Sequence, residues 1–137
     1  MNLQNLLHEC LAHRASDLHL SSGVSPMFRV DGALVAFSSQ PLCQKELHLA
    51  LMDIMSLAQQ TQLNQTHECD FSFEVPALSR FRVNVFEQAR GVSAVFRVIP
   101  HVVPSLDSLH APAAFAELLH RTRGLVLVTG ATGSGKS

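Results

Sequence analysis

The sequence has few cysteines and almost no net charge, and each shortage excludes a class of protein. Its three cysteines are odd in number and widely separated, with no CxxC pair. Neither a disulfide framework nor a tetrahedral zinc site is therefore predicted. Ten Lys and Arg side chains oppose eleven Asp and Glu side chains, giving a formal net charge of -1. No broad basic surface is available to hold a nucleic-acid backbone, so any site for an anion must be local.

Signals for export and for membrane insertion are missing from the sequence as well. Residues 1–4 lack the basic and apolar regions of a signal peptide, and no run approaches the ~18 to 20 apolar residues of a membrane span. Of the 137 residues, 47% are hydrophobic and 15% are charged, which is typical of a chain that forms a globular core. The sequence predicts a soluble intracellular protein with one domain, or one domain and part of a second.

Hydrophobic periodicity predicts an α+β domain over residues 1–100. Apolar residues at helical spacing predict two amphipathic helices, at residues 3–13 and from 44 to about 60. Alternating side chains predict strands at 17–21, 71–75, 81–85 and 92–99, and two apolar-rich runs predict strands at 27–30 and 33–37. The Asp31-Gly32 pair predicts a tight turn between the second and third strands. Short connections favour a largely antiparallel sheet with helices packed on one side.

The character of the sequence changes after about residue 100. Prolines interrupt a stretch with few apolar runs, which predicts a linker over residues 101–111. A second domain is predicted to begin in residues 112–137. Its first element is expected to be a helix with Gly124 just past its end. The continuous apolar segment 125–129 is typical of a buried strand in a parallel sheet.

A phosphate-binding loop is predicted directly after that apolar segment, where residues 130–137 satisfy the pattern GxxxxGK[ST]. Glycines in such a loop let backbone N–H groups approach phosphate oxygens. Lys136 is predicted to contact the β and γ phosphates, and Ser137 to place its hydroxyl on Mg²⁺. The residues predicted to bind ATP are Gly130, Ala131, Thr132, Gly133, Ser134, Gly135, Lys136 and Ser137. The alternative is a flexible Gly-Ser tail.

Hydrolysis needs more than this loop. A helix after the loop, an acidic metal ligand and a group that positions the attacking water are all required, and each would follow residue 137. We therefore assign no catalytic residue here and expect these 137 residues alone not to hydrolyse a nucleotide.

Arginines on the last predicted hairpin form a second candidate site. With the turn just before Arg90, Arg82 and Arg97 lie side by side on the polar face, and Arg90 could join them. Guanidinium groups so placed repel one another unless an anion lies between them, and their shape suits bidentate contacts with phosphate. Two interpretations remain open. The face binds phosphate, or its arginines pair with Asp70 or Glu74 on a neighbouring strand.

Asp17 and His19 resemble a catalytic acid and base. However, no nucleophile or second carboxylate lies at a fixed offset from either residue. We therefore predict a structural role for the strand that carries them.

Several stretches taken together resemble the secretion ATPases of type II secretion and type IV pili, most closely the PilT-like pilus retraction (twitching motility) ATPases. The phosphate loop by itself is shared by many nucleotide-binding proteins, whereas the combination and order of the other stretches is specific to this family. The resemblance covers nearly the whole chain, through residues 16–20, 28–32, 68–74, 80–86, 90–91, 96–100 and 124–137.

The resemblance implies a PAS-like N-terminal domain followed by the start of a RecA-like α/β P-loop ATPase domain. It also implies a cytoplasmic hexamer, peripheral at the inner membrane, that uses ATP and Mg²⁺ to pull pilin subunits out of the pilus. The implied partner is an inner-membrane platform protein, and no nucleic acid is expected. In the family, arginines of the N-terminal domain approach the nucleotide phosphates, and this role falls on Arg82, Arg90 and Arg97.

Other functions remain open at this point. A type II secretion or pilus assembly ATPase is one alternative, because the region that would distinguish it is expected beyond residue 137. A non-enzymatic PAS-like interaction module is another. A third is a nonfunctional remnant that exposes the apolar residues 125–128.

Overall fold

The computed structural model describes residues 1–100, 102 and 104–130. The chain forms two units, Met1–His101 and Val102–Ser137. The second unit contains α4 (Ala114–Leu119). The elements of the first unit are α1 (Leu3–Ala12), β1 (Asp17–Ser21), β2 (Met27–Val30), β3 (Ala33–Ala36), α2 (Gln44–Ile54), α3 (Leu57–Thr66), β4 (Glu68–Val75), β5 (Ser79–Gln88) and β6 (Gly91–Ile99).

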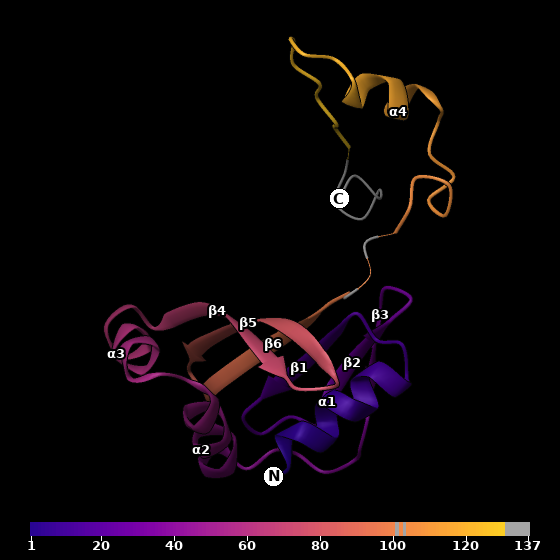
Figure 1. Cartoon of the computed structure of the whole chain (residues 1–137). Coiled ribbons are helices and arrows are strands. Elements are labelled where there is room, and N and C mark those ends of the chain that lie inside the picture. The colour runs from indigo at the N-terminus through magenta and orange to yellow at the C-terminus, as the bar shows by residue number, and fades with distance from the viewer. Residues whose placement is uncertain (101, 103, 131–137) are drawn as a thin grey trace. The chain divides into compact units, whose positions relative to one another are not determined.

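Six strands form one sheet in the order β3-β2-β1-β6-β5-β4 (Figure 1). Every pair of neighbouring strands runs antiparallel, which confirms the predicted α+β class. Asp31 and Gly32 join β2 to β3 with φ angles of 48° and 83°. Positive φ at both central residues is what a type I′ turn requires, so the predicted hairpin forms for the expected reason.

The β5–β6 hairpin has the register that its sequence predicts. Phe81 lies opposite Val98, and Arg82 lies opposite Arg97. Because successive side chains of a strand point to opposite faces, the apolar pair and the arginine pair lie on different sides of the sheet. The adjacency of Arg82 and Arg97 is thereby confirmed.

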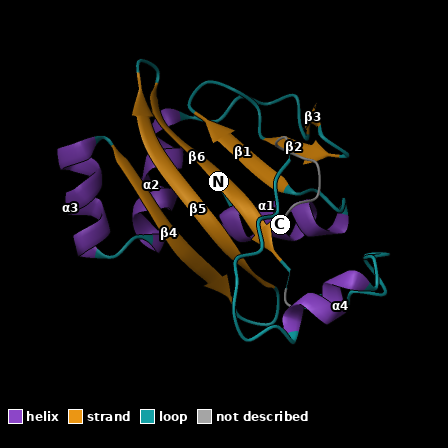
Figure 2. Cartoon of the chain, turned by 90° about the horizontal axis from the view of Figure 1, so that it is seen from above, coloured by secondary structure: helices purple, strands orange, loops and turns teal. Residues whose placement is uncertain are grey.

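Helices cover one face of the sheet and form the core with it. In Figure 1, α1 and α2 lie beneath the sheet, and Figure 2 shows α3 beside β4 at the sheet edge. The rings of Phe81 and Phe96 meet edge to face with their centroids 6.5 Å apart, a favourable arrangement for buried aromatics. The largest fully buried side chains are Phe81, Phe96, Leu7, Leu18, Leu20, Leu47, Leu51, Leu63, Val83, Val85, Cys10 and Cys69. Polar residues of the strands are left on the opposite face.

The single helix predicted from residue 44 to about 60 is wrong, because two helices occupy this region and α3 continues to Thr66. α2 ends at Ile54, and Met55 takes an extended conformation with ψ 134°. Ser56 then caps α3: its Oγ accepts a hydrogen bond from the backbone N–H of Gln59, and its own N–H donates to Gln59 Oε1 at 2.8 Å. This reciprocal capping box starts a new helix, while the apolar spacing continues across the break and hides it.

The predicted elements of the second unit are also corrected. α4 ends at Leu119, so Gly124, with φ 119°, lies beyond its end rather than closing it. Residues 125–129 form no strand, and Leu125 and Leu127 are 81% and 74% exposed. A strand needs a neighbour with which to exchange backbone hydrogen bonds, and none of the described residues supplies one here.

We expect Ser56→Ala to lower the free energy of unfolding by about 1 kcal/mol, because it removes the side-chain acceptor at the start of α3. Urea unfolding followed by circular dichroism measures the change. Thr61→Ala is the matched control: its hydroxyl bonds back to the Leu57 carbonyl within the helix and caps nothing. Equal losses from the two substitutions would contradict the role of the capping box.

Candidate functional site

The sheet face opposite the helices carries a row of charged side chains across four strands. Asp17 of β1 lies between Arg29 of β2 and Arg97 of β6. Arg97 in turn lies opposite Arg82 of β5. In strand order the charges are positive, negative, positive and positive. Two cations are therefore direct neighbours, an arrangement that is unfavourable unless anions lie close to them.

Asp17 is the buried member of this row, with a side chain only 4% exposed. Its Oδ1 accepts a hydrogen bond from Arg97 Nε at 2.9 Å, and its Oδ2 accepts one from Ser16 Oγ at 2.8 Å and lies 3.5 Å from Arg29 Nε. Burial by itself would raise the pKa of this carboxyl. The hydrogen bonds from Arg97 and Ser16, with the charges of Arg97 and His19, outweigh burial and lower the pKa. Asp17 is thus an ionised anchor for two arginines.

Arg82 is held by a different carboxylate and through two hydrogen bonds. Its Nε and Nη2 donate to the two side-chain oxygens of Asp70 on β4, at 3.0 and 2.7 Å. These hydrogen bonds hold the pKa of Asp70 below its ordinary value. Arg80 donates one hydrogen bond from Nη2 to Glu74 Oε2, at 3.4 Å. The alternative in which an arginine of this face pairs with Asp70 is therefore confirmed for Arg82.

Sequence reasoning missed the partner of Arg97. One of the two open interpretations paired the arginines with Asp70 or Glu74 on β4, whereas the structure places the partner of Arg97 on β1, at Asp17, 80 residues away. The alternation of Asp17 with Leu18 indicates which face Asp17 occupies. No local pattern indicates that β1 lies beside β6, so the pairing could not be found from spacing.

Arg82 and Arg97 border a shallow hollow of about 310 Å³, together with Asp70, Asn84 and Val95. The side chain of Arg97 is 66% exposed, and its bond to Asp17 uses Nε. The terminal nitrogens of Arg97 make no hydrogen bond with the residues that the structure describes. The hollow thus offers cationic N–H donors, which suit an anion, and its lining includes no nucleophile.

His19 lies on β1 opposite Val95, close to this hollow in the strand register. Its Nε2 atom is buried and lacks a hydrogen-bond partner within the described part of the chain. Burial, and then the charge of Arg29, lowers the pKa of His19 below its ordinary value, so the neutral imidazole predominates at pH 7. His19 therefore adds little positive charge to the arginine row at that pH.

Arg90 is not brought to the hollow by this fold. It lies in the turn after Gln88, whereas Arg82 lies near the middle of β5. At about 3.4 Å per residue, the six residues from Arg82 to Gln88 span roughly 20 Å. Of the three predicted arginines, Arg82 and Arg97 therefore lie side by side, and Arg90 lies apart from them.

Gly130 is the one residue of the predicted phosphate loop that the structure describes, and it is exposed. The other residues fall outside the described part, and their contacts with ATP and Mg²⁺ stay predictions: Ala131, Thr132, Gly133, Ser134, Gly135, Lys136 and Ser137. Across residues 1–100, 102 and 104–130, no three His, Cys, Asp or Glu side chains are grouped so that they could hold a metal ion. No described helix is both long and apolar enough to cross a bilayer.

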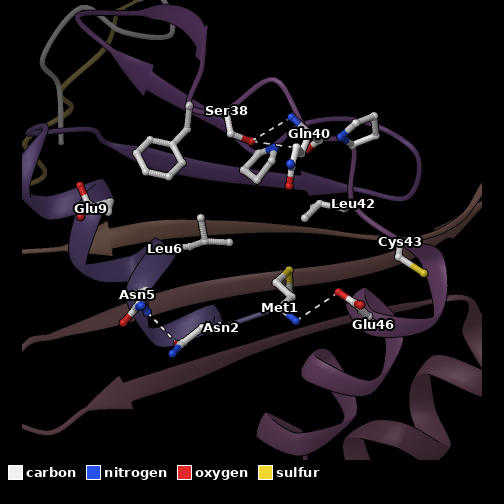
Figure 3. A pocket seen from close by; sticks show the side chains of 13 residues that line it. Met1, Asn2, Asn5, Leu6, Glu9, Ser38, Gln40, Leu42, Cys43 and Glu46 are labelled. Atoms are coloured by element: carbon white, nitrogen blue, oxygen red, sulfur yellow. Dashed lines mark hydrogen bonds and ion pairs between the residues drawn. The ribbon is translucent and has the colours of Figure 1, made fainter.

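A separate pocket of about 570 Å³ opens beside α1, the loop before α2 and the first turn of α2 (Figure 3). The α-amino group of Met1 lies 3.2 Å from Glu46 Oε2 at this pocket. Glu9 adds a second carboxylate to the lining, which includes no Lys or Arg. Two carboxylates and an already paired ammonium do not suit a phosphate. The arginine hollow is the better candidate for an anion.

Comparison with known proteins identifies the family of this chain. The family model described as "Type II/IV secretion system protein" matches residues 1–137. The chain is 47% identical over 137 residues to the type IV pilus retraction ATPase PilT of Pseudomonas aeruginosa, covering 100% of this chain and 40% of that protein. It is 42% identical over 130 residues to a twitching motility protein of Neisseria gonorrhoeae, covering 90% of this chain and 35% of that protein.

The fold is also that of a solved relative. A crystal structure of the pilus retraction motor PilT with bound ADP matches 99% of this chain and 40% of its own, with a TM-score of 0.86 and 36% identity. These matches place the chain among the secretion and pilus ATPases. The chain belongs to the type II/IV secretion system protein family. It spans about 40% of the length of the retraction ATPase from Pseudomonas aeruginosa.

We expect Asp17→Asn to lower the free energy of unfolding at pH 7 by roughly 1.5–3 kcal/mol, because it removes a charge-assisted hydrogen bond. The pKa of Asp17 is lower in the folded chain than in the unfolded chain, where it is about 3.9. Ionised Asp17 therefore stabilises the fold above about pH 3.9, and this stabilisation is lost as the pH falls through the lower folded value.

Urea unfolding of both proteins over a series of pH values tests this expectation. The difference between the wild type and Asp17→Asn should shrink on acidification. Asp53→Asn removes a carboxylate from an exposed position on α2 and serves as the control. A difference for Asp17→Asn that stays constant at every pH would show that its ionisation does not stabilise the fold.

Proposed function

We propose that this chain is the N-terminal part of an ATP-driven motor that retracts type IV pili. The continuous likeness to retraction ATPases along the whole chain carries the proposal. In it, the complete motor is a cytoplasmic homo-oligomer, a hexamer, that lies at the inner membrane and acts on the pilus through a membrane platform protein. The bound ADP of the solved relative supports a nucleotide as the ligand.

In this proposal the nucleotide is held by residues 130–137. Backbone N–H groups of the glycine-rich segment contact phosphate oxygens, Lys136 contacts the β and γ phosphates, and the hydroxyl of Ser137 binds Mg²⁺. Mg²⁺ would neutralise charge that develops on the phosphates. Hydrolysis itself is expected to need residues from the part of the relatives that this chain does not span.

Arg82 and Arg97 sense the terminal phosphate in this proposal. Their adjacency on an open sheet face supports it, since two neighbouring cations are stabilised by an anion between them. Loss of the γ phosphate would remove that anion and favour a different arrangement of the two domains. Arg90 is included on the family resemblance alone, because it lies in the turn beyond the end of β5.

A chimaera tests the retraction role directly. This chain replaces the matching segment of PilT from Pseudomonas aeruginosa, to which it is similar over its entire length. We expect the chimaera to hydrolyse ATP and to restore twitching motility in a strain that lacks PilT, with native PilT as the positive control. A chimaera that folds and hydrolyses ATP but gives no twitching would contradict a role in retraction.

The same chimaera tests the arginines. We expect Arg82→Ala and Arg97→Ala each to lower kcat for ATP hydrolysis by about tenfold or more, because an arginine on the transferred phosphate stabilises the transition state. ADP lacks that phosphate, so its affinity should change little. Steady-state kinetics and ADP titration separate the two effects. Arg80→Ala, on the same strand and paired with Glu74, is the matched control and should leave kcat near the wild-type value.

A further inference from the structure

The two arginines of the hollow are held by carboxylates that differ in position. Asp70 is itself part of the hollow's lining, and its side chain is 42% exposed. Asp17 is not part of that lining, and its side chain is 4% exposed. Asp70 therefore stands where an incoming anion would bind, whereas Asp17 lies beneath the arginine that it holds.

The net charge around Asp17 also differs from the net charge around Asp70. Asp17 faces Arg29 and Arg97, so this group keeps one positive charge in excess. Asp70 faces Arg82 through two hydrogen bonds, so that pair is neutral. An anion is attracted to the first group as the structure stands. It gains the charge of Arg82 only if Asp70 moves away.

The two carboxylates also differ in how easily they can be displaced. Exposed ion pairs are weak, because water and salt compete for both partners. A phosphate carries more negative charge than a carboxylate and forms the same bidentate contact with a guanidinium group, so it can replace Asp70. Asp17 is buried and is contacted by Arg97, Ser16 and Arg29, and its removal from these partners would leave a charge without hydration.

We propose that Asp70 is an internal competitor that occupies the phosphate position of Arg82, and that Asp17 is a positioning residue that holds Arg97 ready for the same phosphate. This inference rests on the proposed phosphate role of the two arginines. Arg82 then has two partners, the carboxylate in the absence of phosphate and the phosphate in its presence. Because β4 is the edge strand of the sheet, a change in the Asp70 side chain disturbs no strand beyond it.

The test uses the 137-residue chain and tripolyphosphate as the probe. The side-chain Nε–Hε signals of Arg82 and Arg97 in ¹⁵N NMR spectra give the affinity. We expect Asp70→Asn to strengthen tripolyphosphate binding about two- to fivefold, the range expected when an exposed competing pair is removed. Glu74→Gln removes the same charge from the same strand, but Glu74 does not line the hollow, so its effect should be smaller. Backbone spectra verify that each variant is folded.

A second measurement needs no substitution. As tripolyphosphate binds to the wild-type chain, the carboxyl ¹³C signal of Asp70 should move toward that of an unpaired aspartate, while the signal of Asp17 should not. Equal gains in affinity for Asp70→Asn and Glu74→Gln, or an Asp70 signal that stays in place during binding, would overturn the competition.

The outcomes also separate this inference from the proposed function. If Arg82 and Arg97 respond to tripolyphosphate at the same concentration in the wild type and in Asp70→Asn, the phosphate role stands and the competition is wrong. If neither arginine responds in any variant, the phosphate role fails, and the inference fails with it.

Discussion

The pairing of β1 with β6 is the contact on which the rest of the first unit depends. It joins residues 72 to 80 positions apart and makes one sheet from the β1–β3 strands and the β4–β6 strands. On the helix side the pairing sets Leu18 against Phe96, both fully buried, and on the open side it sets Asp17 against Arg97. The burial of apolar surface offsets the entropy lost in closing so long a loop. The register of β1 against β6 therefore determines which residues meet in the core and which meet on the charged face.

The open face combines a firmly held cation with a loosely held one. Arg97 is fixed by a carboxylate that is buried and bonded on several sides, whereas Arg82 is paired with one that is exposed to solvent. A cation that is held in place, such as Arg97, can bind an anion without first rearranging. A cation with a weak partner, such as Arg82, can change partner when the anion binds, so its conformation depends on that anion. In the proposed function, such a face would distinguish a nucleotide with a terminal phosphate from one without it.

Local patterns in the sequence predicted most of the fold of the first unit. Strand alternation and the Asp31-Gly32 turn determine the hairpins, and the short turn after Gln88 determines which residues of β5 and β6 face each other. The break between α2 and α3 is hidden by apolar spacing that continues through it, and its only local signal is the capping pair Ser56 and Gln59. The Asp17–Arg97 contact could not be predicted at all, since it depends on a strand pairing between distant segments.

The most direct test of this account is a cryo-electron microscopy structure of the assembled chimaeric ATPase with a non-hydrolysable ATP analogue. The account predicts that the guanidinium group of Arg97 lies about 3 Å from an oxygen of the terminal phosphate while it remains bonded to Asp17. It also predicts that Arg82 has left Asp70 for the same phosphate. A structure in which the analogue is bound, Arg82 remains on Asp70 and solvent separates both arginines from the phosphate would contradict it.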